Sequence, residues 1–403
     1  MKYIVILADG MADEPLEQLG GKTPMEAAEK PNMDRLATEG IMGMAQTVPK
    51  GMPPGSDTAN MAVMGFDPKK YYSGRSPLEA VAMGIDLKAD DVTYRSNLVC
   101  LTEEECYEDK TMVDFSAGEI TTEEAEELIR AVQSLLPGDM QLYCGISYRH
   151  CLVRSKGRTG AVLTPPHDIT GKPIAAHLPQ GCYGQELLAL QKASHAILKD
   201  HPVNLDRTAR GLRPANSLWF WGEGTKPRFD TLQALYGITG GVVCAVDLIK
   251  GLGLCAGMRA AEVPTATGGM VTDYAGKADA ALRLLEDGCD LVYIHIEAPD
   301  ECSHHGSAEA KIDAIEAIDA LVLGRIRNAL GDQAYRILLT PDHPTPVARM
   351  THTGAPVPFV LYDSERQRNH PRRYTEAEAE KTGLFLSQGH SLMEALVSGN
   401  LEE

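Results

Sequence analysis

The sequence predicts an α/β protein in which a mainly parallel sheet flanked by helices is interrupted by an inserted, smaller α+β domain. Three apolar runs that stop abruptly at polar residues are the main indication, and they lie at residues 2–8, 290–296 and 335–340. Continuous aliphatic and β-branched runs of this length are typical of strands buried on both faces of a parallel sheet. Helical patterns alternate with these runs, which is the order expected of a layered α/β fold.

Helices are expected between the strands. The first spans residues 32–40 and follows Pro31, a residue favoured at the first helical position. The second spans residues 272–287 and is closed by Gly288. A third, at residues 308–330, carries apolar side chains along one side. A shorter helix at residues 244–250 is expected to stop at the glycine-rich segment 251–257.

The middle of the chain has a different pattern. Short strand-like pieces occur at residues 92–101, 141–143 and 151–154, together with an amphipathic helix at residues 121–136 and several turn-rich stretches. We interpret residues 90–216 as an inserted domain. Residues 1–89 and 217–403 then form a discontinuous core.

The composition excludes several classes of protein. The 403 residues carry 38 basic and 56 acidic side chains, a formal charge of −18, which argues against non-specific nucleic-acid binding because that depends on Lys and Arg contacts with phosphate. No window approaches the roughly 18 consecutive apolar residues of a membrane span, and Asp9 interrupts the apolar N-terminus, unlike a signal peptide. The nine cysteines form no CxxC pair. We expect a cytoplasmic protein with reduced thiols.

Polar residues follow each of the three expected strands, where the carboxyl ends of parallel strands meet at one edge of the sheet and bind ligands. Mixed carboxylate and imidazole sets suit Zn²⁺ or Mn²⁺, and carboxylates with water suit Mg²⁺. Three Asp and three His could bind two divalent ions, an arrangement that stabilises the attacking and leaving oxygens of phosphoryl transfer. The residues are Asp9, Asp300, His304, Asp342, His343 and His352, and a polar turn at residues 53–60 contains Ser56 and Asp57.

Each of these residues taken alone has a simpler explanation. An Asp after a strand is often a helix N-cap, a single loop His is often only hydrogen-bonded, and Pro, Gly, Ser and Asp are common in turns. Three such strand ends in one α/β unit favour a site over coincidence. Neither residues 21–23 nor the segment 251–257 fits a glycine-rich nucleotide loop, so no organic cofactor is expected.

Taken together, six motifs resemble one family in their order along the chain. They lie at residues 7–10, 31–34, 54–58, 299–304, 341–343 and 352–358. They are similar to the cofactor-independent phosphoglycerate mutases of the alkaline-phosphatase superfamily, in the archaeal-type branch that also occurs in bacteria. The resemblance spans nearly the whole chain and implies an alkaline-phosphatase-like core.

The resemblance also implies a site and a reaction. One divalent ion (Mn, Mg or Zn) would be held by Asp9, Ser56, Asp342 and His343, and a second by Asp300, His304 and His352. Ser56 would be the nucleophile that accepts the phosphate of a small phosphorylated substrate as a phosphoserine and returns it to another hydroxyl. Substrate binding would fall to Asp57, Arg75, Arg149, His150, Arg213 and Lys277. A homo-oligomer is compatible with the sequence but not required by it.

Departures from the family pattern leave the substrate open. Archaeal mutases typically carry His where this chain has Asn60, and residues 72–80 and 341–346 resemble a bacterial subgroup proposed to act as homoserine kinases. We therefore expect a phosphoglycerate mutase, with an ATP-dependent homoserine kinase as the alternative on the same metals and Ser56. A phosphatase, or a catalytically silent metal-binding member, is a weaker alternative.

Overall fold

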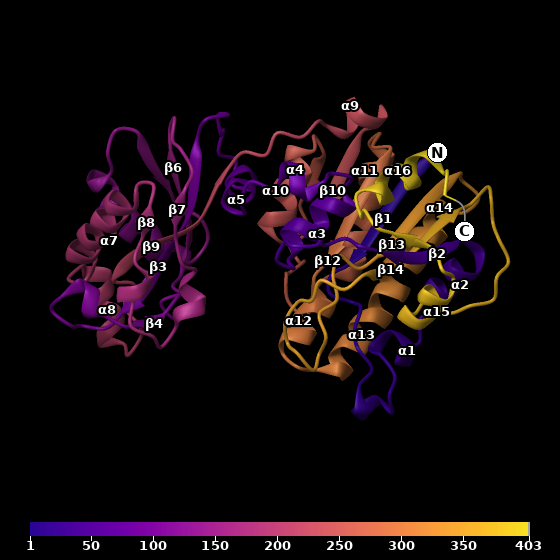
Figure 1. Ribbon diagram of the computed structural model, residues 1–403, viewed down its shortest axis with the longest axis horizontal. Coiled ribbons are helices and arrows are strands. Elements are labelled where there is room, and N and C mark those ends of the chain that lie inside the picture. The colour runs from indigo at the N-terminus through magenta and orange to yellow at the C-terminus, as the bar shows by residue number, and fades with distance from the viewer. Residues whose placement is uncertain (402–403) are drawn as a thin grey trace. The chain divides into compact units, whose positions relative to one another are not determined.

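The computed structural model describes residues 1–401, which fold into two compact units (Figure 1). The core unit consists of residues 1–72 and the chain from residue 228 onward, and the inserted unit consists of residues 73–227. Both boundaries lie outside the expected residues 90 and 216. The reason is pairing: strand β9 (Ser217–Thr225) is hydrogen-bonded to β3 (Val92–Leu101) inside the inserted unit, and helix α5 (Ser76–Ala82) packs on both.

An eight-stranded sheet forms the centre of the core unit, in the order β11-β10-β12-β1-β13-β14-β2-β15. Neighbouring strands from β11 to β13 are parallel, and β14 is antiparallel to both β13 and β2. The strands are β1 (Lys2–Ala8), β2 (Ile41–Ala45), β10 (Gly240–Val243), β11 (Arg259–Ala261), β12 (Leu291–Ile296), β13 (Tyr335–Thr340), β14 (Val357–Asp363) and β15 (Phe385–Leu386).

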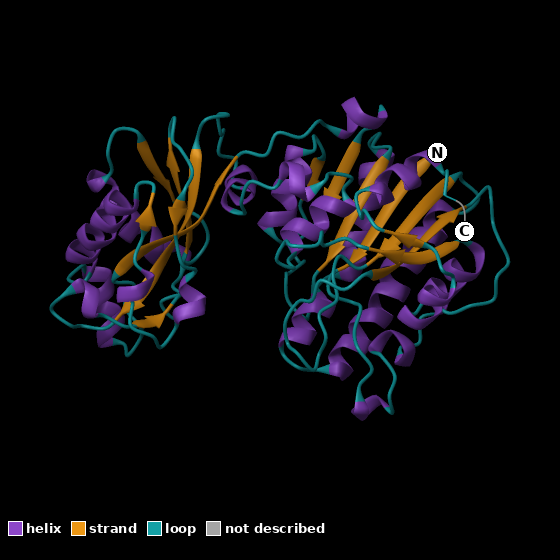
Figure 2. Ribbon diagram, viewed as in Figure 1, coloured by secondary structure: helices purple, strands orange, loops and turns teal. Residues whose placement is uncertain are grey.

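Helices cover both faces of this sheet (Figure 2). One layer contains α2 (Pro31–Glu39), α11 (Tyr274–Glu286), α13 (Ala308–Ala317) and α14 (Arg325–Leu330), with a π-helical turn at Ile318–Gly324 joining the last two. The other contains α3 (Ser56–Val63), α10 (Asp247–Cys255) and α16 (Ser391–Ser398). Shorter helices are α1 (Pro24–Ala27), α4 (Pro68–Tyr71), α9 (Leu232–Tyr236), α12 (Ala298–His304) and α15 (Glu376–Lys381).

The inserted unit is an antiparallel sheet packed against helices. β3 pairs with β4 (Met112–Asp114), β6 (Arg149–Arg154) and β9, and β6 pairs with β5 (Met140–Tyr143). Apolar side chains of α6 (Thr122–Val132) and α7 (Gly184–Leu198) form a core with this sheet. A small hairpin, β7 (Ala161–Val162) with β8 (Gln180–Gly181), and helix α8 (Pro202–Ala209) complete the unit.

The expected fold class is confirmed, and the three apolar runs are the central strands β12, β1 and β13. One local prediction is wrong. The segment 251–257 does not stop a helix, because α10 runs on to Cys255 and includes Gly253. A Cβ at Gly253 would come within 2.6 Å of Val242 on β10, so glycine permits the close packing of helix and strand there. Across residues 1–401, no helix combines the length and apolar character that a membrane crossing needs.

Candidate active site

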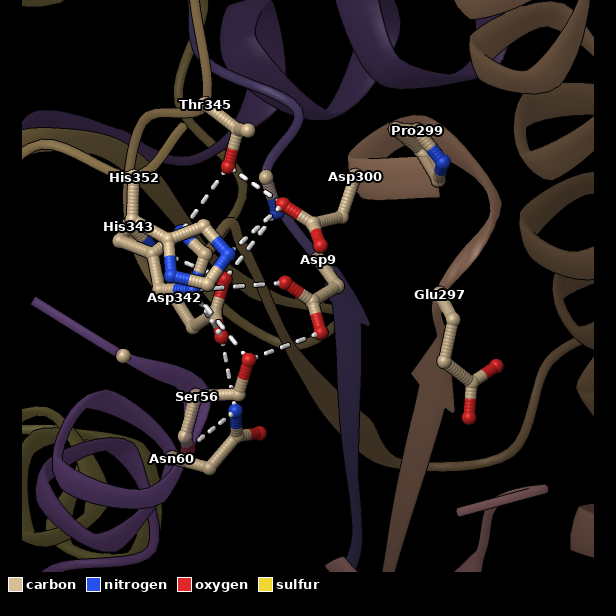
Figure 3. Close-up of polar contacts among 12 residues, drawn as sticks. Asp9, Ser56, Asn60, Glu297, Pro299, Asp300, Asp342, His343, Thr345 and His352 are labelled. Carbon is tan, nitrogen blue, oxygen red and sulfur yellow. Dashed lines mark hydrogen bonds and ion pairs between the residues drawn. The ribbon is translucent and has the colours of Figure 1, made fainter. Parts of the chain in front are cut away.

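The carboxyl ends of three neighbouring strands form the site. β1 pairs in parallel with β12 on one side and β13 on the other, so the segments that follow them start at the same edge of the sheet. Asp9 follows β1, helix α12 after β12 carries Asp300, and Asp342 follows β13 (Figure 3). The predicted ligands therefore meet because of the strand order β12-β1-β13.

Asp9, Asp342 and His343 form the first ligand group, and all three are buried. The Nε2 atom of His343 lies 3.7 Å from Oδ1 of Asp9 and 3.4 Å from Oδ2 of Asp342. Oδ1 of Asp9 is buried without a hydrogen-bond partner. An unsatisfied buried carboxylate oxygen next to an imidazole nitrogen is a costly arrangement that a bound cation would relieve.

A hydroxyl fixes which nitrogen of His343 carries the proton. Thr345 Oγ1 donates to Oδ1 of Asp300 at 2.5 Å, and its single proton is then used. The contact of 3.2 Å between Thr345 Oγ1 and Nδ1 of His343 consequently requires the proton on Nδ1. Burial lowers the pKa of His343, which favours the neutral ring. The lone pair on Nε2 therefore faces the two carboxylates, as a metal ligand requires.

Asp300, His304 and His352 form the second ligand group. The Nε2 atoms of the two histidines lie 3.0 Å apart, and that of His304 lies 3.1 Å from Oδ2 of Asp300. Nδ1 of His304 lies 3.0 Å from the carbonyl oxygen of Met350, so a proton on Nδ1 leaves the Nε2 lone pair free for a cation. The geometry and chemistry of this donor set also fit a divalent ion.

Three carboxylates crowd this edge of the sheet. Burial, followed by the charges of Asp342 and Asp300, raises the pKa of Asp9 well above its usual value. Burial also opposes ionisation of Asp300, but hydrogen bonds from His304 and His352 lower its pKa well below the usual range. The same contact raises the pKa of His304 to about 9. The residues present therefore fit positive charge at both groups.

Ser56 is the first residue of α3, after Gly55, and its side chain faces the first ligand group (Figure 3). Its Oγ lies 3.4 Å from Oδ2 of Asp9 and 3.3 Å from Nε2 of His343. A phosphate attached to this oxygen would lie at a helix N-terminus, where the helix dipole favours negative charge.

Close packing around the ligands depends on two further residues. Gly10 has φ +61°, and a Cβ there would come within 2.6 Å of both Asp300 Oδ1 and Thr345 Oγ1. Buried Asn60 donates to Oδ2 of Asp342 at 2.8 Å and accepts from the Tyr293 hydroxyl at 2.7 Å. Asn60, noted in the sequence as a departure from the family, is thus part of the site. Thr345 and Tyr293 were not predicted, because their partners depend on the fold.

Three arginines gather around one carboxylate in the inserted unit. Arg75 and Arg95 pair with Glu79 at 2.9 and 2.7 Å. Burial opposes ionisation of Glu79, but Arg95, Arg75 and Arg149 together lower its pKa. The Arg95 guanidinium, which was not predicted, stacks 4.0 Å above Trp221. The excess of positive charge is suited to anions.

The other predicted substrate residues have different surroundings. Arg213 is exposed and donates to Asp114 at 2.5 Å. Asp57 accepts a hydrogen bond of 2.5 Å from the Tyr72 hydroxyl. Lys277 is fully buried in α11 of the core unit, and its ammonium pairs with Glu297 at 2.5 Å. Lys277 was predicted to bind substrate, but helix–sheet packing covers its side chain instead of leaving it open to a ligand.

His150 is also placed differently from the expectation of a cationic ligand. It is buried in β6 of the inserted unit, and its Nδ1 accepts from Gly145 N at 3.2 Å. Burial lowers its pKa to about 3, so the ring is neutral near pH 7. A neutral, covered imidazole does not pair with phosphate.

The buried His150 is expected to make the protein acid-sensitive. Below its unfolded pKa of about 6.5, the unfolded chain takes up a proton that the folded chain does not, so stability falls as pH falls. From pH 7 to pH 5 this group alone should cost about 2 kcal/mol. Urea unfolding in EDTA at both pH values should show a smaller loss for His150→Gln than for the wild type. An equal loss in both proteins would contradict this assignment.

Comparisons with known proteins agree with the fold. The sequence profile for 2,3-bisphosphoglycerate-independent phosphoglycerate mutase matches residues 37–204. A probable enzyme of that name from Geobacter sulfurreducens is 48% identical over 98% of this chain and 100% of its own length. One from Methanothrix thermoacetophila is 47% identical, with coverage of 99% and 100%.

Solved structures show the same architecture. A protein from Pyrococcus horikoshii has a TM-score of 0.82 at 29% identity, covering all of this chain and 98% of that one. The cofactor-independent phosphoglycerate mutase of Thermoplasma acidophilum has a TM-score of 0.68 at 27% identity, covering 99% of each chain. Fold and site together define an α/β protein with two Asp–His groups at the carboxyl edge of its sheet. The chain belongs to the 2,3-bisphosphoglycerate-independent phosphoglycerate mutase family.

Proposed function

We propose that this protein interconverts 3-phosphoglycerate and 2-phosphoglycerate through a phosphoserine formed on Ser56. The position of Ser56 Oγ, between Asp9 at 3.4 Å and His343 at 3.3 Å, is the observation that carries the proposal. The names of the relatives support the substrate. Nothing in these similarities supports the homoserine kinase alternative.

The ligand groups would each hold one divalent ion, the first with Asp9, Asp342, His343 and Ser56, the second with Asp300, His304 and His352. Such ions lower the pKa of a hydroxyl and offset the charge that develops on phosphoryl oxygens. Because Thr345 fixes the tautomer of His343 and hydrogen-bonds Asp300, it keeps both groups in a binding orientation. We keep Mn²⁺, Mg²⁺ and Zn²⁺ as candidate ions.

The protein's own residues then perform three tasks. Asp9 Oδ2 accepts the Ser56 hydroxyl proton, because it lies 3.4 Å from Oγ and the Nε2 lone pair of His343 would be used by the cation. The N-terminus of α3 stabilises the phosphate on Ser56. We further propose that Arg75, Arg95 and Arg149 of the inserted unit bind the anionic groups of the substrate, since guanidinium forks match carboxylate and phosphate.

The proposal is tested by following phosphorus NMR of purified protein with Mn²⁺. With 3-phosphoglycerate alone, 2-phosphoglycerate is expected to form without ATP and without release of inorganic phosphate. A parallel sample receives ATP and homoserine. Phosphohomoserine as the main product would replace the mutase by the kinase, and inorganic phosphate as the main product would indicate a phosphatase.

A further inference from the structure

Lys277 is covered by packing, and its contacts lie beneath the first ligand group. Its Nζ donates to Oε2 of Glu297 at 2.5 Å and to the backbone oxygen of His295 at 2.8 Å. Lys277 and His295 are fully buried, and Glu297 is nearly so. The ammonium thus holds the end of β12 by a side chain and by the backbone.

Glu297 is held from several directions. Its Oε1 accepts from the backbone N–H of Ala245, which follows β10, at 3.1 Å, and Oε2 takes the Lys277 ammonium. Oε1 also lies 3.1 Å from Nδ1 of His295. The segment after β10 together with α11 and β12 therefore fixes this carboxylate, and the carboxylate in turn confines one side of the His295 ring.

The other side of the His295 ring contacts a predicted metal ligand. Its Nε2 lies 3.0 Å from Oδ2 of Asp9, a close ion pair rather than an aligned hydrogen bond. His295 is opposite Leu7 in the parallel pairing of β12 with β1, two residues before Asp9. With Oδ2 engaged in this way, Oδ1 is the Asp9 oxygen that faces Nε2 of His343.

We propose that His295, held by Glu297 and Lys277, is a positioning residue that orients Asp9 and thereby sets the cation affinity of the first ligand group. The inference rests on the proposed metal-dependent function. Groups that orient a metal ligand from behind typically change metal affinity 10–100-fold when they are removed, so an effect of about that size is expected. Among the interactions described for residues 1–401, His295 contacts Asp9 but none of Asp300, His304 and His352. Removal of His295 should therefore weaken the first ligand group and not the second.

The test is a Mn²⁺ titration of the full-length protein, with free Mn²⁺ read by electron paramagnetic resonance and no substrate present. The wild type is expected to bind two ions. His295→Leu should weaken one of the two sites by about 10–100-fold and leave the other within about two-fold. His295→Gln should recover part of the loss, because its amide N–H can extend toward Asp9 as the ring nitrogen does.

A double variant, Lys277→Met with Glu297→Gln, covers the chance that single changes unfold the protein, since it leaves neither charge buried without its partner. It should weaken the same site. Lys30→Met is the matched control: Lys30 is equally buried and pairs with Asp34 at 2.8 Å on α2, so both sites should keep wild-type affinity.

Four outcomes would overturn the inference. Equal weakening of both sites in the His295 and Lys277 variants would indicate a general structural role. Unchanged Mn²⁺ affinity with a raised KM for 3-phosphoglycerate would return Lys277 to substrate binding. A wild-type chain that binds no Mn²⁺ would overturn the proposed function along with the inference, whereas two tight sites unaffected by His295→Leu would overturn the inference alone.

Discussion

Ser56→Ala is expected to lower kcat by about 10⁴-fold or more, as removal of a nucleophile does in other enzymes with covalent intermediates. Its Oγ is the hydroxyl that lies within 3.4 Å of Asp9 and 3.3 Å of His343, so the variant leaves the phosphate without an acceptor. The two Asp–His groups remain, and Mn²⁺ binding should stay within a few-fold. Turnover of 3-phosphoglycerate is measured beside Mn²⁺ titration.

Ser303→Ala provides the control for this substitution. Ser303 is buried in α12, close in sequence to Asp300, but its hydroxyl donates to the Pro299 carbonyl at 2.8 Å. Its loss should leave kcat near the wild-type value. Rapid quenching of the wild type with 3-phosphoglycerate should in addition reveal a phosphate adduct on Ser56 by mass spectrometry. Substantial turnover by Ser56→Ala would exclude the phosphoserine route.

The sequence was sufficient to predict the residues whose signal is local. Asp9, Asp342 and His343 stand where an apolar run ends, and the parallel pairing of β1 with β12 and β13 is what such runs favour. His352 and the polar turn with Ser56 were candidates by residue type, and only the resemblance to a family assigned them to a ligand set and a nucleophile. The order of the motifs along the chain indicated which residues act together, which their spacing alone could not.

Residues whose role depends on sheet order could not be predicted. His295 lies within an apolar run, and a polar side chain at such a position is a signal, but its partner Asp9 becomes a neighbour only because β12 lies beside β1. Lys277 resembles any helical surface lysine until α11 is packed on β12. The predicted boundaries of the inserted unit differ from the observed ones for the same reason, since β9 pairs with a strand more than one hundred residues away in sequence.

Asp9→Asn is expected to change metal-free stability and metal binding in opposite directions. Burial and the charges of Asp342 and Asp300 raise the pKa of Asp9, so the ionised carboxylate destabilises the metal-free fold increasingly as pH rises above its unfolded pKa of about 4. Asn removes that charge, and urea unfolding in EDTA at pH 7 should show a stability gain of about 1 kcal/mol or more. Protonation of Asp9 removes the same charge and should likewise stabilise the metal-free fold.

With Mn²⁺ present, the wild type should be more stable than Asp9→Asn. An ion at about 100 times its Kd stabilises the wild type by about 2.7 kcal/mol per site, and Asp9→Asn should lose most of this gain at one site and at least about 100-fold in kcat.

Asp319→Asn is the control, because burial also raises the pKa of Asp319, yet this carboxylate accepts from Asn32 and Met33 on α2. It should leave the Mn²⁺-dependent gain intact. A lower EDTA stability for Asp9→Asn would show that its charge is already balanced without a cation, whereas an unchanged Mn²⁺ gain would remove Asp9 from the ligand set. The substitution therefore tests whether the carboxylates at this edge are crowded because they are arranged to bind a cation.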